Sequence, residues 1–195
     1  MMPAKKKYRL LEDDTIVRDG RTLYRIEALR DVCYNVKEGN VGGYVESEAN
    51  LSHDGRCWLY QEACAYEDAR LEEDATLWGH ATLRGKAKLH HRARMKSRSI
   101  VQGEAMIGGT SFIGDQVVVG GNAILKGNVS LSDDVHVGGN ACLEGDDPSL
   151  SLMIEGTTMI HGDTIMQGYG RFPERDAIFE TGSFLIEEEK DDEDD

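Results

Sequence analysis

Seven basic residues lie in one short stretch that contains no acid, residues 84–98. A belt of cations of this kind could bind an anion, such as the phosphates of coenzyme A, or a polyanionic partner. Arg84, Lys86, Lys88 and Arg92 are therefore the candidate contacts for the phosphates of an acyl-CoA cofactor. The other bases of the stretch are Arg94, Lys96 and Arg98.

Histidines supply the candidate bases for catalysis. A catalytic histidine must reach a substrate hydroxyl or amine, and a carboxylate usually orients it. His91 and His136 are the candidates. Glu73 precedes His91 by eighteen residues, a spacing that would bring the two together if residues eighteen apart stack, as discussed below. His136 occupies an outward strand position where it could face a neighbouring subunit. The pair His90-His91 has no further group at ligand spacing, so we expect no metal site.

These residues lie in a six-residue repeat that runs from Cys57 to Asp146 without a gap. The third position of every sextet is apolar and the first is small or β-branched, so two inward positions lie two residues apart, as in a strand. The remaining positions often hold a glycine followed by a polar residue, which suits a tight corner. Each sextet is therefore predicted to be a short strand and a corner of an all-β repeat fold.

The segments outside the repeat are predicted to cap it. Thr15–Val17 and Thr22–Ile26 flank an Asp-Gly turn, which indicates a hairpin over the first coil. After the interruption at Asp147–Leu150, three looser sextets are expected to point Met153, Met159 and Ile165 inward. The predicted units are a cap and entry segment (1–56), the β-helix (57–168), a C-terminal cap with Pro173, Phe179 and Phe184 (169–186), and a disordered acidic tail (187–195).

The N-terminal segment resembles a known group of repeat proteins. Lys7-Tyr-Arg-Leu10, Val36-Lys-Glu-Gly39, Gly42–Glu48 and Cys57-Trp-Leu-Tyr60 are similar in order and spacing to YdcK-type hexapeptide-repeat proteins of enterobacteria and prophages. The resemblance implies a left-handed parallel β-helix with three sextets in each coil, so that residues eighteen apart stack. It also implies an acyltransferase-like activity with acetyl-CoA as cofactor.

The charged residues also have a structural interpretation in this arrangement. Acids dominate residues 62–74 and bases dominate the next coil, so stacking would form a ladder of opposite charges at the corners. Exposed pairs contribute only about 0–1 kcal/mol each, so such a ladder would fix strand register more than it would add stability. The stacked pairs are Glu62–His80, Asp68–Lys86, Glu72–His90, Glu73–His91 and Asp74–Arg92.

Apolar residues occupy the outward second position of five consecutive sextets. A band of this kind is unusual on a monomer surface, and it predicts subunit contact, with a trimer of parallel axes favoured; the alternative is that the C-terminal segment covers it. The residues are Ile100, Met106, Phe112, Val118 and Ile124.

Composition limits the possible partners. The net charge is −14, half of which comes from the last nine residues, so extensive nucleic-acid binding by the body is not expected. No signal peptide or long apolar run is present, and the four cysteines lack metal-ligand spacing, which indicates reduced thiols in the cytoplasm. Cys57 is expected inside, and Cys64 and Cys142 on the outer surface.

Three functions are compatible with this sequence. The first is a cytoplasmic β-helical scaffold or binding protein, of phage or prophage type, that acts through protein–protein contacts. The second is an acyl-CoA-dependent acyltransferase with its active site between subunits. The third is an acidic decoy that occupies a nucleic-acid-binding protein through Glu187–Asp195.

Overall fold

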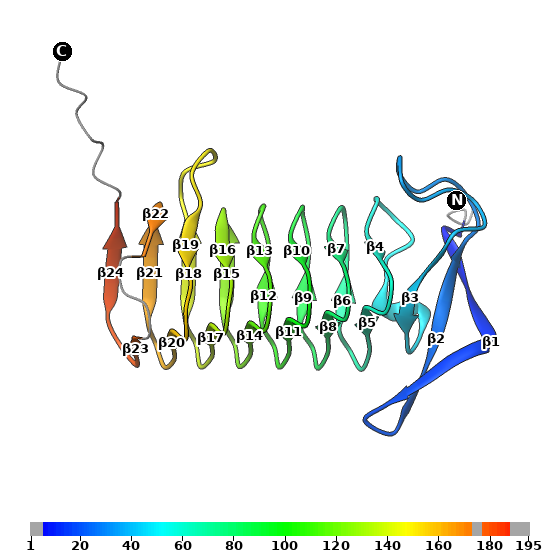
Figure 1. The fold of residues 1–195 in the computed structure, drawn as a ribbon, viewed down its shortest axis with the longest axis horizontal. Coiled ribbons are helices and arrows are strands. Elements are labelled where there is room, and N and C mark those ends of the chain that lie inside the picture. Colours follow the sequence, from blue (N-terminus) through cyan, green and yellow to red (C-terminus); the bar gives the residue numbers. More distant parts are fainter. Residues whose placement is uncertain (1–5, 173–176, 188–195) are drawn as a thin grey trace, which may run out of the picture.

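The computed structural model describes residues 6–172 and 177–187, and within these ranges the chain is almost entirely β-structure. Short strands stack in successive coils of a parallel β-solenoid, with the N-terminal hairpin at one end, as Figure 1 shows. The predicted all-β fold of parallel stacked coils is confirmed. Pro173 and residues 188–195 of the predicted tail lie outside the described residues. No described helix is long and apolar enough to cross a membrane.

Face A, the first of three sheets, has ten strands and includes the N-terminal hairpin. Its strands, in spatial order, are β1 (Tyr8–Arg18), β2 (Arg21–Ala28), β3 (Val41–Val45), β5 (Cys64–Ala65), β8 (Thr82–Leu83), β11 (Ile100–Val101), β14 (Val118–Val119), β17 (His136–Val137), β20 (Met159–Ile160) and β23 (Ile178–Phe179).

Faces B and C have seven strands each. Face B contains β4 (Trp58–Leu59), β7 (Thr76–Leu77), β10 (Arg94–Met95), β13 (Phe112–Ile113), β16 (Val129–Leu131), β19 (Leu152–Ile154) and β22 (Gly170–Arg171). Face C contains β6 (Arg70–Leu71), β9 (Lys88–Leu89), β12 (Met106–Ile107), β15 (Ile124–Gly127), β18 (Cys142–Gly145), β21 (Ile165–Gly168) and β24 (Ser183–Ile186). A 3-10 helix, η1 (Glu48–Asn50), precedes the array.

The six-residue pattern determines which side chains fill the interior. Arg94 pairs with Thr76 before it and with Phe112 after it, each eighteen residues away, so successive coils stack in register. The first and third positions of each sextet are buried, as Ala75 and Leu77 illustrate with no exposed surface. The second positions point outward, because alternate residues of a strand face opposite sides.

The N-terminal hairpin is present as predicted. β1 and β2 pair in an antiparallel arrangement that closes at Arg18 and Arg21, and Asp19 and Gly20 adopt positive φ of 50° and 75°, as a two-residue hairpin turn requires. β2 pairs with β3, which pairs in parallel with β5, so the hairpin continues face A and covers the edge of the first coil.

The hairpin also covers part of the outer side of face A. Leu23, Tyr44, Cys64 and Tyr66 form a small buried cluster, against which Ile16 packs. The expectation that Cys64 lies on the outer surface was therefore wrong: it points away from the solenoid interior, but the hairpin buries it. Cys57 is buried inside as expected, and Cys142 is half-buried on face C.

In the coil after the interruption, the inward and outward positions are shifted by one residue from the predicted ones. β16 pairs with β19 so that Ser130 lies beside Met153, 23 residues later, and the loop at 147–150 extends from the solenoid in Figure 1. Leu152 and Ile154 are buried, whereas Met153 is 36% exposed. The predicted inward positions of Met153, Met159 and Ile165 were wrong, because a slip of one residue exchanges the two sides of a strand.

Phenylalanines fill the last described coil. β22, β23 and β24 pair in parallel with β19, β20 and β21, so this segment continues the three faces. Phe179 makes edge-to-face contacts with Phe172 and Phe184, with ring centroids 5.3 and 4.9 Å apart. The aromatic cluster replaces the aliphatic interior at this end of the described solenoid.

Candidate anion-binding pocket

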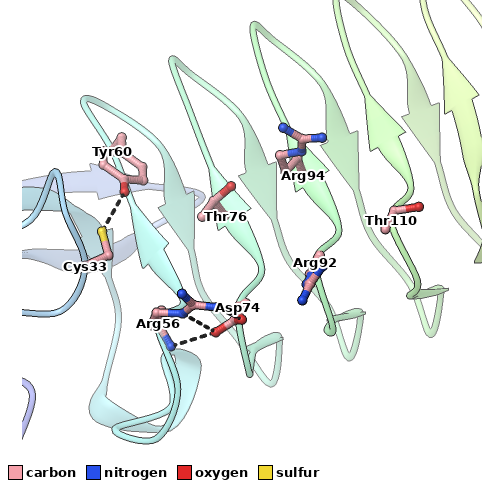
Figure 2. A pocket seen from close by; sticks show the side chains of 8 residues that line it. All are labelled: Cys33, Arg56, Tyr60, Asp74, Thr76, Arg92, Arg94 and Thr110. Carbon is pink, nitrogen blue, oxygen red and sulfur yellow. Dashed lines mark hydrogen bonds and ion pairs between the residues drawn. The ribbon is translucent and has the colours of Figure 1, made fainter.

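A cavity of about 440 Å³ lies on face B near the N-terminal end, beside the CB corner, where the chain passes from face C to face B. Figure 2 shows the side chains around it. Residues eighteen apart along the corner form one side, β7 and β10 form the floor, and the segment before β3 closes one end. The lining residues are Arg56, Asp74, Arg92, Thr110, Thr76, Arg94, Tyr60 and Cys33.

Positive charge exceeds negative charge in this pocket. Arg56 and Asp74 are paired through two contacts, from Nε to Oδ1 at 3.1 Å and from Nη2 to Oδ2 at 2.5 Å. The Arg56 hydrogen bond lowers the pKa of Asp74 and keeps it ionised. Arg92 and Arg94 are exposed and form no ion pair among the described residues. Two guanidinium groups are thus available to an anion.

The end of the pocket nearest the hairpin is aromatic. The Tyr60 ring stacks on Trp78 with centroids 3.6 Å apart and an interplanar angle of 9°. The Tyr60 hydroxyl lies 3.7 Å from Cys33 Sγ, and burial raises the pKa of this tyrosine. The wall therefore stays neutral at physiological pH and offers a flat apolar surface beside the arginines.

The structure divides the four predicted cofactor contacts between two corners and one face. Arg84 and Lys86 lie at the AC corner, where the chain passes from face A to face C, and Lys88 lies on face C. Arg84 pairs with Asp19, Lys86 with Glu104 and Lys88 with Glu72. Of the four, Arg92 lines the pocket.

The charged ladder takes a different form from the predicted one. Glu73 meets His91 as expected, since its carboxylate accepts a hydrogen bond from the His91 backbone N–H at 2.7 Å. Glu62, Glu72 and Asp74 pair with other cations, because long side chains reach the hairpin, a diagonal neighbour or the preceding coil, and Lys86 pairs with an acid of the next coil. The pairs that replace the predicted ones are Glu62–Arg25, Glu72–Lys88, Asp74–Arg56 and Lys86–Glu104.

The two candidate bases lie far apart in the fold. His136 projects half-buried from β17 in line with Val118, and its Nδ1 lies 3.0 Å from the Asp134 carbonyl oxygen. His91 lies at the CB corner, where its Nδ1 is 2.5 Å from Nδ1 of the half-buried His90. Burial, and then the neighbouring His91, lowers the pKa of His90.

Sequence reasoning did not identify the pocket. The eighteen-residue spacing alone places four of its lining residues in one row, so the sequence could have predicted this row. These residues are Arg56, Asp74, Arg92 and Thr110. Cys33 lies outside the repeat, and no periodicity indicates which face it meets. The sequence pairs Glu73 with His91, but it does not predict that Glu73 lies close to both histidines.

Comparisons with known proteins give no family for the chain. No family model matches it, and no curated protein matches it significantly.

Proposed function

We propose that this protein is a β-solenoid scaffold of the YdcK type that acts through protein–protein contacts, the first of which is its own assembly into a trimer with parallel axes. The observation that carries the proposal is a pair of outward-facing, mostly apolar columns, half-buried to exposed, on either side of an uncharged corner. The phage or prophage origin and the cytoplasmic location belong to the same proposal; the residues of the N-terminal motif and four free cysteines support them.

One apolar column lies on the outer side of face A. Ile100 pairs with Val118, Val118 with His136, His136 with Met159, and Met159 with Ile178. The candidate base His136 is therefore surrounded by apolar neighbours on adjacent strands. This column continues from the middle of the solenoid to its last described coil.

The second column lies on the outer side of face C. Met106 and Ile124 are neighbours there and are 45% and 42% exposed, and Cys142 and Ile165 continue the line. Phe112 occupies face B, so the five apolar residues of the predicted band are distributed over three faces.

The AC corner between these columns carries no charge over two coils. Gly120-Gly121-Asn122 and Gly138-Gly139-Asn140 follow the strands of face A, and Asn122 Nδ2 donates to Asn140 Oδ1 at 2.9 Å. The corner residues themselves are small and uncharged, although the His161 ring of the following coil packs over Gly138 and Gln102 of the preceding coil lies beside Gly120. Over these two coils the uncharged corner therefore joins the two columns into one uncharged wedge.

A second copy of this chain fits the wedge because the spacing of its rungs is identical. With parallel axes, apolar residues that repeat about every 4.8 Å in one copy meet residues with the same repeat in the next. A cyclic arrangement then closes without leaving an exposed wedge. This geometry supports the proposed scaffold function, since a trimer presents three equivalent outer surfaces to further partners.

Light scattering on the purified chain tests this proposal. We expect the mass of a trimer, and we expect Val118→Glu with Ile124→Glu to give a folded monomer. Phe112→Glu is the control, because it replaces an apolar residue by a glutamate on face B, outside the proposed contact. A monomeric wild-type chain, or a double variant with unchanged mass, would overturn the proposal.

The arginine pocket favours a second candidate function, that of an acyl-CoA-dependent acyltransferase. Arg92 and Arg94 offer two free guanidinium groups, which suit the phosphates of a coenzyme A, beside the stacked Tyr60 and Trp78 rings. Calorimetry with acetyl-CoA tests it: saturable binding should be lost in Arg92→Ala/Arg94→Ala and kept in Arg70→Ala, which removes an exposed arginine from face C. Absence of binding by the wild-type chain would exclude this candidate.

A further inference from the structure

The CB corner holds a cluster of metal-ligating side chains next to the arginine pocket. Glu73, His90 and His91 each offer one ligand atom, and these atoms all lie within 4.8 Å of one another. Glu73 belongs to the coil of β6 and the two histidines to the coil of β9, so eighteen-residue stacking brings them together. We propose that Glu73, His90 and His91 form a binding site for a divalent transition metal, with Zn²⁺ as the ion.

The backbone holds Glu73 in place for this role. Glu73 and His91 occupy equivalent corner positions with positive φ of 58° and 57°. The Glu73 oxygen Oε2 accepts the His91 N–H at 2.7 Å and lies 3.6 Å from His91 Nδ1. The carboxylate is thus fixed beside the imidazole and retains lone pairs for a metal ion.

His90 is positioned by a glycine on the next coil. A Cβ at Gly108 would lie 2.7 Å from His90 Cε1 and 2.9 Å from its Nε2, so the imidazole occupies space that a larger residue would fill. This packing directs His90 Nδ1 toward His91 Nδ1. Both rings keep Nε2 free of any described partner.

The two Nδ1 atoms lie within hydrogen-bond distance of each other, so one ring must donate and the other accept. Two lone pairs cannot face each other at 2.5 Å without a proton or another cation between them. In the absence of metal a proton occupies this place. When the metal binds, both Nδ1 atoms coordinate it. In a neutral pair, the proton displaced from Nδ1 passes through solvent to Nε2 of the same ring, which was unprotonated. Each ring then carries one proton on Nε2, and no redox step is involved.

The donor set selects the kind of ion. Two imidazole nitrogens and one carboxylate oxygen suit Zn²⁺, whereas Ca²⁺ and Mg²⁺ prefer oxygen ligands. A tetrahedral ion with bonds of roughly 2.0–2.1 Å separates its two nitrogens by about 3.3 Å. The histidine rings must therefore move apart by less than about 1 Å, which the exposed His91 side chain permits.

The site leaves one coordination position open. Three protein ligands and an open position are the arrangement in which zinc binds water or another small ligand. A cavity of about 330 Å³, lined by residues that include Glu73, His91 and Arg92, adjoins the cluster and offers room for that ligand. The nearby ammonium group of Lys88 is neutralised by Glu72 at 2.6 Å, so it opposes the metal charge only weakly.

Metal titration of the full chain tests the proposal. In calorimetry with ZnCl₂ under reducing conditions we expect one ion per chain, and at least about tenfold weaker binding in His91→Ala and in Glu73→Gln. Glu73→Gln keeps an acceptor for the His91 N–H, so its fold should not change. His80→Ala is the matched control, since it removes an exposed histidine from another corner and should leave binding unchanged.

Cobalt provides an independent readout of the ligands. Co²⁺ bound at this site should show visible d–d absorption without thiolate charge-transfer bands, and Gly108→Ala should weaken its binding by displacing His90. Absence of zinc binding by the wild-type chain, equal binding by His91→Ala, or a thiolate spectrum would each overturn the proposal.

Discussion

Asp19, at the tip of the N-terminal hairpin, pairs with Arg84 on the solenoid, with Oδ2 and Nη1 2.7 Å apart. The Tyr66 hydroxyl donates to the same carboxylate oxygen at 2.8 Å. The hairpin is therefore attached twice, at its base through the pairing of β2 with β3 and at its tip through Asp19. The pair with Asp19 also occupies the guanidinium group of Arg84, which the sequence predicts as a contact for cofactor phosphates.

The attachment of the tip should depend on pH. The hydrogen bond from Tyr66, followed by the bond and charge of Arg84 and the charge of Arg18, lowers the pKa of Asp19 below its ordinary value of 3.8. A carboxyl group whose pKa is lower in the folded state stabilises that state above the ordinary value, and this contribution is lost as the pH falls through the lowered value.

Carboxyl carbon NMR of Asp19 checks this expectation. The titration midpoint should lie below 3.8 and should rise in Tyr66→Phe, which removes the donated hydrogen bond. Tyr24→Phe serves as the control, because it removes a hydroxyl without a described contact to Asp19. A wild-type midpoint at or above the ordinary value would show that the tip is not held by this carboxylate.

The periodic part of the fold could be predicted from sequence because one spacing determines it. Arg94 lies between Thr76 and Phe112, as eighteen-residue stacking requires. The same spacing could not predict that Cys64 is buried, because the hairpin that covers it lies outside the repeat. It also could not fix the frame after residue 146, where the insertion of a few residues reverses the sides of each strand.

The site was less predictable than the fold because side-chain partners do not follow the period. Glu72 lies beneath His90 by stacking but extends to Lys88, and Asp74 turns back to Arg56 rather than forward to Arg92. Flexible side chains have several neighbours within reach on a corner, and the sequence does not rank them. Glu73 and His91 meet as predicted because the backbone N–H of His91 fixes one partner.

The frame of the coil after the insertion leads to a stability prediction. Ile154 is fully buried, whereas Met153 is 36% exposed on face B. Ile154→Ala should therefore destabilise the protein by about 2–5 kcal/mol through loss of buried methyl groups and a cavity. Met153→Ala should change stability by no more than about 0.5 kcal/mol, as surface substitutions usually do. Urea denaturation followed by circular dichroism compares the two; the reverse order of stability would support the frame with Met153 inward.

Glycines at the CB corner provide a test of how closely the coils approach. Gly127 has a φ of 73°, and a Cβ added to it would lie 1.9 Å from the Gly145 carbonyl oxygen on the next coil. Gly20 in the hairpin turn has a similar φ of 75°, but nothing lies within 4 Å of its added Cβ. Alanine at either position should lower the stability by about 1–2 kcal/mol, because a residue with a Cβ disfavours the left-handed backbone conformation.

Gly127→Ala should cost roughly a further 1–3 kcal/mol, because the clash forces the two coils apart. The amide of Asn128, which donates to the Gly145 carbonyl at 3.0 Å, should then exchange with solvent faster, while Gly20→Ala should leave its protection unchanged. Hydrogen exchange measured by NMR distinguishes the two variants locally, which matters because solenoid coils need not unfold together. Equal protection of Asn128 in both variants would mean that the coils tolerate a wider separation than the backbone contact indicates.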